Sequence, residues 1–286
     1  MRKAIIFFVV LYLGYFIAKR IQKNWAEAPA KTAVSSLDSL PSLLPLDKSD
    51  YNVLLYSKAN GWVHTDAIAA AKEVFPRLAQ QQGWKLTVSD DSALFNAAQL
   101  SYFDVVIWNN VTGQTLDDTQ RKAFKRYIET GGGFVGIHGA GDDSHQWNWY
   151  DKKVIRTLFS HHPMQPQFQV GTLNKMGDSL FPATKDFPDQ WQWEDEWYVF
   201  YESPKQYGST VLYNLDESNL VMVGEQEDKQ WGMGEDHPVV WYHCQKKGKV
   251  FYTAMGHKGT YYQDTQYQQL LIEAVEWAGN TSINCN

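Results

Sequence analysis

The chain has 286 residues, of which 44% are hydrophobic and 20% are charged, and its formal net charge is −6. This is the composition of a folded globular protein, and the lack of a basic excess argues against a nucleic-acid partner. The part that follows the N-terminal region, roughly 235 residues, is long enough for one α/β domain with a single core.

The N-terminal segment is an uncharged apolar run, Ala4–Ala18, with basic residues on both sides. The run is shorter than the roughly 20 residues that a full membrane span needs, and its length also fits the apolar region of a signal peptide. No small-residue cleavage site follows it directly. We therefore expect residues 1–23 to be an uncleaved membrane anchor, with a removed signal peptide as the alternative.

A linker and a single domain are expected after this segment. Residues 24–50 are rich in Ala, Ser, Pro and Leu without a clear period, which predicts a linker. Residues 51–280 form the predicted domain. An anchored chain would hold this domain on the periplasmic or another extracytoplasmic side of the membrane, whereas a cleaved chain would be secreted.

Strand-like and helix-like segments alternate through the first half of the predicted domain. Apolar or alternating runs predict strands at residues 52–57, 84–89, 104–109 and 134–138. Apolar residues at helical spacing predict a helix over residues 65–82, which Pro76 should kink or end. A second helix is expected to open with a capping box at residues 115–118 and to run to Thr130. This alternation favours a doubly wound, mostly parallel α/β sheet.

The alternation is lost between residues 151 and 235, where aromatic residues, Pro and Gly are frequent. We expect an aromatic-rich insertion there. Regular order returns with strands predicted at residues 239–244 and 250–254, which are joined by a Lys-Lys-Gly turn and can form an antiparallel hairpin. A final helix is predicted over residues 266–277.

Three histidines follow predicted strands. His64 lies in the loop after the first strand, His138 closes the strand FVGIH, and His257 follows the strand in VFYTAMGH. The carboxyl ends of parallel strands meet at one edge of an open α/β sheet, and ligands bind at that edge. We therefore expect these three imidazoles to lie together, although each one alone could have a structural role.

The chain contains two cysteines, Cys244 in an apolar run and Cys285 in the C-terminal tail. Their spacing is not that of a metal site. A disulfide bond between them would require an oxidising compartment. Two unpaired thiols are the favoured interpretation, with the disulfide as the alternative.

Four longer motifs occur in order along the predicted domain. They are GGGFVGIHGAGD (Gly131–Asp142), WEDEWY (Trp193–Tyr198), HPVVWYH (His237–His243) and GKVFYTAMGH (Gly248–His257). With these motifs, residues 51–279 resemble the ThuA-like, or trehalose utilisation, family. The resemblance implies a flavodoxin-like fold related to that of the class I glutamine amidotransferases. It also implies a role in bacterial carbohydrate catabolism, on trehalose-type or 3-keto sugar derivatives.

The amidotransferase relationship implies a test of the chemistry. Those enzymes carry a catalytic Cys on a tight turn after a strand, where a helix N-terminus can lower its pKa. In this sequence His138 occupies the place of that turn, while Cys244 lies within a predicted strand and Cys285 in the tail. The sequence therefore argues against a thiol amidotransferase.

Histidines and carboxylates allow two kinds of chemistry in this histidine-rich crevice. A divalent metal such as zinc could be bound by His64, His138 and His257 together with a carboxylate. The carboxylates considered for this role are Asp142, Asp143, Glu194 and Glu196. No short-range metal motif is present, so metal-free proton transfer by histidine is the competing hypothesis.

We expect an enzyme that acts on sugars or keto sugars as a hydrolase, lyase or isomerase. The predicted catalytic residues are His64, His138, His257, Glu196 and Asp142. Tryptophan rings suit the faces of a sugar, and polar side chains beside them suit its hydroxyl groups. The predicted substrate-binding residues are Trp147, Trp193, Trp197, Asp143 and His162. The alternative is a non-catalytic, membrane-tethered carbohydrate-binding or scaffold module.

Overall fold

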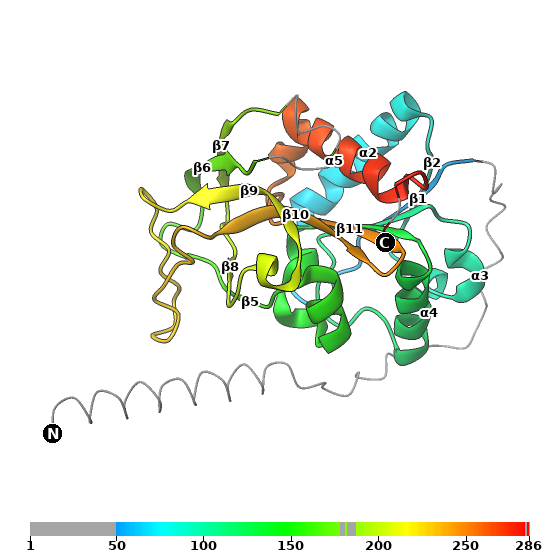
Figure 1. The fold of residues 1–286 in the computed structure, drawn as a ribbon, viewed down its shortest axis with the longest axis horizontal. Helices are drawn as coiled ribbons and strands as arrows, with labels where there is room; N and C mark the ends of the chain where they lie inside the picture. The colour runs from blue at the N-terminus through cyan, green and yellow to red at the C-terminus, as the bar shows by residue number, and fades with distance from the viewer. Residues whose placement is uncertain (1–49, 178–180, 182–186, 284, 286) are drawn as a thin grey trace, which may run out of the picture.

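A nine-stranded sheet runs through the computed structural model, which describes residues 50–177, 181, 187–283 and 285. The strand order is β2-β1-β3-β4-β11-β10-β9-β6-β7, and β5 and β8 form a separate two-stranded sheet. Figure 1 shows α2 and α5 on one side of the large sheet and α3 and α4 on the other. The parallel part of the large sheet is therefore covered by helices on both faces.

The strands are β1 (Asn52–Tyr56), β2 (Lys85–Ser89), β3 (Val105–Asn109), β4 (Gly133–Ile137), β5 (Phe159–His161), β6 (Gln169–Lys175), β7 (Gln190–Asp195), β8 (Val199–Phe200), β9 (Thr210–Asp216), β10 (Pro238–Gln245) and β11 (Gly248–Thr253). The α-helices are α2 (Thr65–Gln82), α3 (Ala97–Leu100), α4 (Asp118–Glu129) and α5 (Thr265–Gly279). Short 3₁₀ or π turns are η1 (Ser92–Leu94), η2 (His138–Gly141), η3 (Asp143–His145), η4 (Tyr150–Ile155), η6 (Pro204–Tyr207) and η7 (Gly259–Gln263).

The first five strands across the sheet confirm the predicted α/β fold. β2, β1, β3, β4 and β11 pair in parallel, in the 2-1-3-4-5 order of flavodoxin-like sheets. Every residue of β1, β3, β4 and β11 is buried, as expected for parallel strands with helices on both faces. This burial explains why these segments are mostly apolar in the sequence.

The predicted aromatic-rich insertion at residues 151–235 is not confirmed as such. Three strands from this segment, β9, β6 and β7, extend the large sheet beyond β10 by antiparallel pairing. An uncovered edge of β10 would leave backbone N–H and C=O groups unpaired, and the added strands satisfy them. The segments between these strands differ in length, so the strands do not form a regular pattern in the sequence.

Much of the aromatic excess lies in the core. Trp108 of β3 is 1% exposed and stacks on Phe124 of α4 with ring centroids 5.1 Å apart. Tyr150 packs on the same tryptophan at 4.9 Å. Aromatic pairs of this kind contribute more than their buried area alone. These rings therefore hold α4 and the segment after β4 against the sheet.

The predicted bounds of the helix over residues 65–82 are confirmed, whereas the start of the next helix differs from the prediction. Pro76 lies inside α2 and does not end it, because the helix continues to Gln82 and stops at Gly83, whose φ of 76° is left-handed. The capping box of α4 is formed by Asp117 and Gln120, two residues later than predicted.

The predicted N-terminal anchor and almost all of the predicted linker lie outside the described residues. Within the part of the chain that the structure describes, no helix is both long and apolar enough to cross a membrane.

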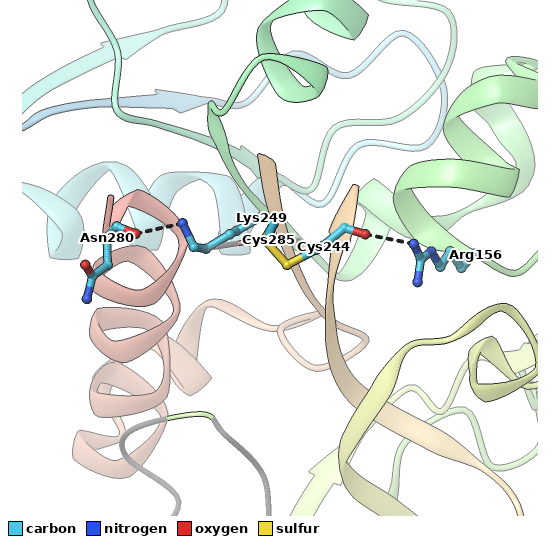
Figure 2. The surroundings of a disulfide bond; sticks show 5 residues. All are labelled: Arg156, Cys244, Lys249, Asn280 and Cys285. Carbon is cyan, nitrogen blue, oxygen red and sulfur yellow. Dashed lines mark hydrogen bonds between the residues drawn. A yellow bond between two sulfur atoms is a disulfide. The ribbon is translucent and has the colours of Figure 1, made fainter. Parts of the chain in front are cut away.

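A disulfide bond joins Cys244 and Cys285, so the expectation of two unpaired thiols is wrong (Figure 2). The tail after α5 returns to the end of β10, and the two Cα atoms are 5.5 Å apart, a normal separation for a disulfide. On one side the carbonyl oxygen of Cys244 accepts a hydrogen bond from Arg156, and on the other Lys249 donates to the carbonyl oxygen of Asn280. The sequence could not place the tail beside β10.

Breaking this disulfide should lower the free energy of unfolding. The bond closes a loop across a sequence separation of 41, and a loop of that length predicts a loss of about 2–4 kcal/mol in the Cys285→Ser variant. Chemical denaturation of the variant and of the wild type, with and without reductant, measures this. Two titratable thiols in unreduced wild-type protein would contradict the bond.

Candidate functional site

Four side chains from distant parts of the chain meet at the carboxyl edge of the parallel strands. They are His64, His138, Glu196 and His257, and one nitrogen or oxygen atom of each lies within 4.8 Å of the others. His64 precedes α2 in the connection from β1, His138 follows β4, and His257 follows β11. The predicted meeting of the three imidazoles is therefore confirmed. We call these four residues the imidazole centre.

Three of the atoms in the imidazole centre are in direct contact. The distance between His138 Nε2 and His257 Nδ1 is 3.1 Å, and Glu196 Oε2 lies 3.1 Å from His257 Nδ1 and 3.4 Å from His138 Nε2. The His64 ring is edge-on to both other imidazoles, with centroids 4.9 Å from His138 and 4.7 Å from His257. All four groups therefore face one small volume.

His138 is held in an unusual backbone conformation. Its φ is 47°, in the left-handed region that few residues other than glycine adopt. Strain of this kind persists only where surrounding contacts impose it. The Tyr252 hydroxyl donates to the carbonyl oxygen of His138 at 2.8 Å, and His138 Nδ1 lies 2.7 Å from the carbonyl oxygen of Ala254. A carbonyl only accepts, so Nδ1 carries a proton and Nε2 faces the centre.

Glu196 reaches the centre from the segment that follows β7. Its side chain is 3% exposed. While Oε2 faces His138 and His257, the other oxygen, Oε1, accepts a hydrogen bond from Gln167 Nε2 at 2.6 Å and lies 3.2 Å from His162 Nδ1. The carboxylate is therefore oriented by contacts on both of its oxygens.

Asp195 connects the end of β7 to the loop after β11. Its carboxylate accepts hydrogen bonds from the backbone N–H groups of Glu196 (2.9 Å), Gly256 (2.8 Å) and His257 (3.3 Å), and from the indole of Trp193 (2.9 Å). The side chain is fully buried. Asp195 thus fixes the backbone that carries Glu196 and His257. Asp195 was not among the predicted site residues, although the alternation of β7 places Asp195 on the buried face and Glu194 outside.

The electrostatics of the imidazole centre favour a positive charge beside Glu196. Burial lowers the pKa of His64 to about 2, and the other imidazoles act in the same direction. Burial also lowers the pKa of His138, but its hydrogen bond with Glu196 and the charges of Asp195 and Glu196 outweigh this and raise it. Contacts with His138 and His257 outweigh burial and lower the pKa of Glu196. Glu196 is therefore an anion, and His64 is neutral.

The rim of the centre is formed by His162, Phe168 and His257. The side chains of His162 and His257 are 26% and 14% exposed, whereas that of His138 is not exposed. The Phe168 ring packs on His257 with centroids 5.0 Å apart, and Lys258 Nζ lies 3.7 Å from the centroid of the same ring. A ligand would therefore reach the centre past His162 and His257.

The other predicted carboxylates do not join the imidazole centre. Asp142 caps η3 by accepting from Ser144 and lies 3.6 Å from His145 Nε2. Asp143 lies within η3 and is likewise not among the four grouped side chains. Glu194 points outward and pairs with Lys258 at 2.6 Å. The prediction of Asp142 as an assisting group is therefore not supported by its position.

The three tryptophans predicted to bind substrate are core residues. Trp147, Trp193 and Trp197 are 8%, 7% and 1% exposed. The Trp197 indole donates to the carbonyl oxygen of Gln169, and Trp193 packs on Tyr267. A ring covered on its faces cannot stack on a sugar, so this burial argues against the predicted role.

Two further histidines and both cysteines lie outside the centre. His237 is fully buried between Glu217 and the carbonyl oxygen of Tyr198, and His243 is buried between Ser209 and the carbonyl oxygen of Lys153. Neither cysteine is free, because both form the disulfide. The structure therefore offers no thiol for amidotransferase chemistry.

Asp195→Ala should destabilise the protein strongly, because it leaves four buried N–H donors without their acceptor. We expect a loss of at least about 3 kcal/mol in the free energy of unfolding, measured by chemical denaturation. Glu194→Ala is the matched control, since it removes the neighbouring carboxylate on the exposed face and should cost less than about 1 kcal/mol. Equal losses in the two variants would contradict the structural role of Asp195.

Comparisons with known proteins agree with this architecture. A ThuA-like protein from Bacteroides uniformis ATCC 8492 is 24% identical and has a TM-score of 0.67, over 85% of this chain and 97% of that protein. A ThuA-like protein from Parabacteroides merdae ATCC 43184 is 18% identical and has a TM-score of 0.61, over 83% and 92%. These structures share the fold.

A search of curated proteins found no match. The model of the ThuA family, described as trehalose utilisation, matches residues 52–278, which is nearly all of the described part of the chain. This match includes all four residues of the imidazole centre, and it confirms the resemblance drawn from the sequence motifs. The chain belongs to the ThuA, or trehalose utilisation, family.

Proposed function

We propose that this protein is an enzyme of carbohydrate catabolism that acts on trehalose-type or 3-keto sugar derivatives at the imidazole centre. The observation that carries the proposal is the contact among His138, His257 and Glu196 at 3.1–3.4 Å, with His64 facing them. The family description supports a carbohydrate-related role. The three imidazoles and the carboxylate supply the reactive groups.

The cost of building this centre supports a functional role. Burying ionisable groups and holding His138 at a positive φ both cost free energy of folding. Neither feature is needed to close the hydrophobic core, which is already continuous through β1, β3, β4 and β11. Buried groups with perturbed pKa values that gather at one edge of a sheet are typical of active sites.

The chemistry that suits these groups is proton transfer beside a carbonyl group. In a 3-keto sugar, the hydrogen on the carbon next to the carbonyl is acidic, and an imidazole can remove it as a general base. The electrons then move onto the carbonyl oxygen, which needs positive charge nearby. Loss of a group from the next carbon completes an elimination, and return of the proton to another carbon completes an isomerisation.

Two schemes provide the positive charge. In the metal-free scheme, an imidazolium formed by His138 or His257 donates to the carbonyl oxygen. In the metal-assisted scheme, His64, His138, His257 and Glu196 would hold a divalent cation, which would supply Lewis-acid polarisation of the carbonyl group. The partly exposed His162, at the rim and 3.2 Å from Glu196, is placed to contact the substrate in either scheme.

We also propose that the domain works in an oxidising, extracytoplasmic compartment, tethered through residues 1–23 or released by their cleavage. The disulfide between Cys244 and Cys285 supports this location, because such bonds are rare in reducing compartments. The apolar run Ala4–Ala18 is consistent with export.

His138→Asn tests the catalytic role of the centre. Asn tolerates a positive φ better than most residues, so this variant removes the imidazole with little added backbone strain. We expect kcat/KM on a 3-keto glucoside to fall by about 10²–10⁴-fold, with the unfolding midpoint little changed. Glu196→Gln should lose activity to a similar extent. Glu225→Gln is the control, because it makes the same substitution at an exposed position outside the centre, and it should keep the activity.

The alternative function is a non-catalytic carbohydrate-binding or scaffold module. The low exposure of His138 and Glu196 favours it in one respect, since only a small ligand surface can reach them. Calorimetric titration of wild-type protein with trehalose and with a 3-keto glucoside, alongside product analysis, separates the two functions. If the wild type binds a sugar but turns over neither, the protein is a binding module and the proposed enzymatic function is rejected.

A further inference from the structure

We propose that the imidazole centre is a divalent-metal site in which His64, His138, His257 and Glu196 are the protein ligands. The inference deepens the proposed function and rests on it for the identity of the substrate carbonyl. Glu196 was one of several carboxylates in the sequence prediction, and the structure selects it from them.

Three of the four donor atoms are spaced nearly as the ligands of a single ion would be. Bonds of about 2.0–2.2 Å to nitrogen and oxygen place the ligands of a tetrahedral ion about 3.3–3.6 Å apart. The three contacts among His138 Nε2, His257 Nδ1 and Glu196 Oε2 are 3.1, 3.1 and 3.4 Å. The His64 donor completes a set within 4.8 Å. To seat an ion, the three close donors would move slightly outward, and the His64 donor would move inward.

Hydrogen bonding alone accounts for only part of this arrangement. A proton shared among His138, His257 and Glu196 would explain their three contacts. It would not explain His64, which is 5% exposed and whose buried Nδ1 has no hydrogen-bond partner. A buried imidazole nitrogen without a partner is costly. An ion bound to the His64 ring would offset the free-energy cost of burying this imidazole in the centre.

Three of the four ligands, His138, Glu196 and His257, are oriented by partners outside the set. The carbonyl oxygen of Ala254 accepts a hydrogen bond from His138 Nδ1, so Nε2 is the nitrogen that can bind an ion. Gln167 donates a hydrogen bond to Oε1 of Glu196, so that Oε2 faces the other ligands. The carboxylate of Asp195 accepts a hydrogen bond from the backbone N–H of His257. Histidine and carboxylate ligands of metals are regularly supported in this way, and loss of such a partner weakens binding about 10–100-fold.

The ligand set indicates the kind of ion. Imidazole suits zinc, iron, nickel and copper, and a carboxylate extends the range to manganese. No thiolate can take part, because both cysteines are in the disulfide. When bound, such an ion would act as a Lewis acid on a sugar carbonyl that approaches on the partly exposed side of His257.

Metal binding is tested on the full chain, stripped with a chelator and then titrated with Zn²⁺ or Co²⁺. We expect one ion per chain by elemental analysis, visible Co²⁺ absorption bands, and a rise in the unfolding midpoint on loading. His64→Ala and Glu196→Ala should weaken binding by more than about 100-fold, and Gln167→Ala by about 10–100-fold. His161→Gln is the matched control, because His161 is 6% exposed like His64 but lies outside the centre.

The outcomes separate this inference from the proposed function. Wild-type protein that takes up no ion and shows no rise in unfolding midpoint overturns the metal site, whatever the variants do. Sugar turnover by that same metal-free protein would leave the proposed function standing on the imidazoles alone. One bound ion without turnover would support the metal site and reject the enzyme. Equal affinity in His64→Ala and His161→Gln would remove His64 from the ligand set.

Discussion

The parallel register of β4 and β11 is the constraint on which the site depends. Ile137 pairs with Thr253, so the two strands end level with each other. His138 therefore follows directly at the sheet edge, next to Ala254, whose carbonyl oxygen holds the His138 ring. Pairing of β3 with β4 places Asn109 level with Ile137 and extends the same edge. A register shift would turn side chains to the opposite face and separate these groups.

The carboxylate side of the centre comes from a part of the fold that the parallel strands do not dictate. β7 is the last strand of the antiparallel extension, yet the residues at its end return to the loop after β11 through Asp195. One buried side chain thus accepts the backbone N–H groups that position Glu196 and His257. The antiparallel strands consequently do more than cover an edge, because they deliver the only carboxylate among the four grouped residues.

Burial gives the centre its chemical character. The carboxylate of Glu196 is nearly inaccessible to water, so its interactions with His138 and His257 are screened little and strongly favour the ionised form. The same burial keeps His64 neutral. A neutral imidazole and an anion side by side attract a cation, whether that cation is a proton on a neighbouring ring or a metal ion. The disulfide lies apart from this chemistry, at the opposite end of the β10–β11 hairpin.

The sequence by itself determined the parallel half of the fold and the meeting of His64, His138 and His257, because buried strands and strand-end residues follow local, periodic patterns. The tertiary structure alone decided that Glu196, and not Asp142, completes the imidazole centre. It also decided that the three tryptophans Trp147, Trp193 and Trp197 are core residues. The pairing of Cys244 with Cys285 was likewise decided only by the tertiary structure. Each of these depends on contacts between segments far apart in the chain. The local sequence pattern predicts to which face of its strand a side chain points. It does not predict which residue of another segment that side chain contacts.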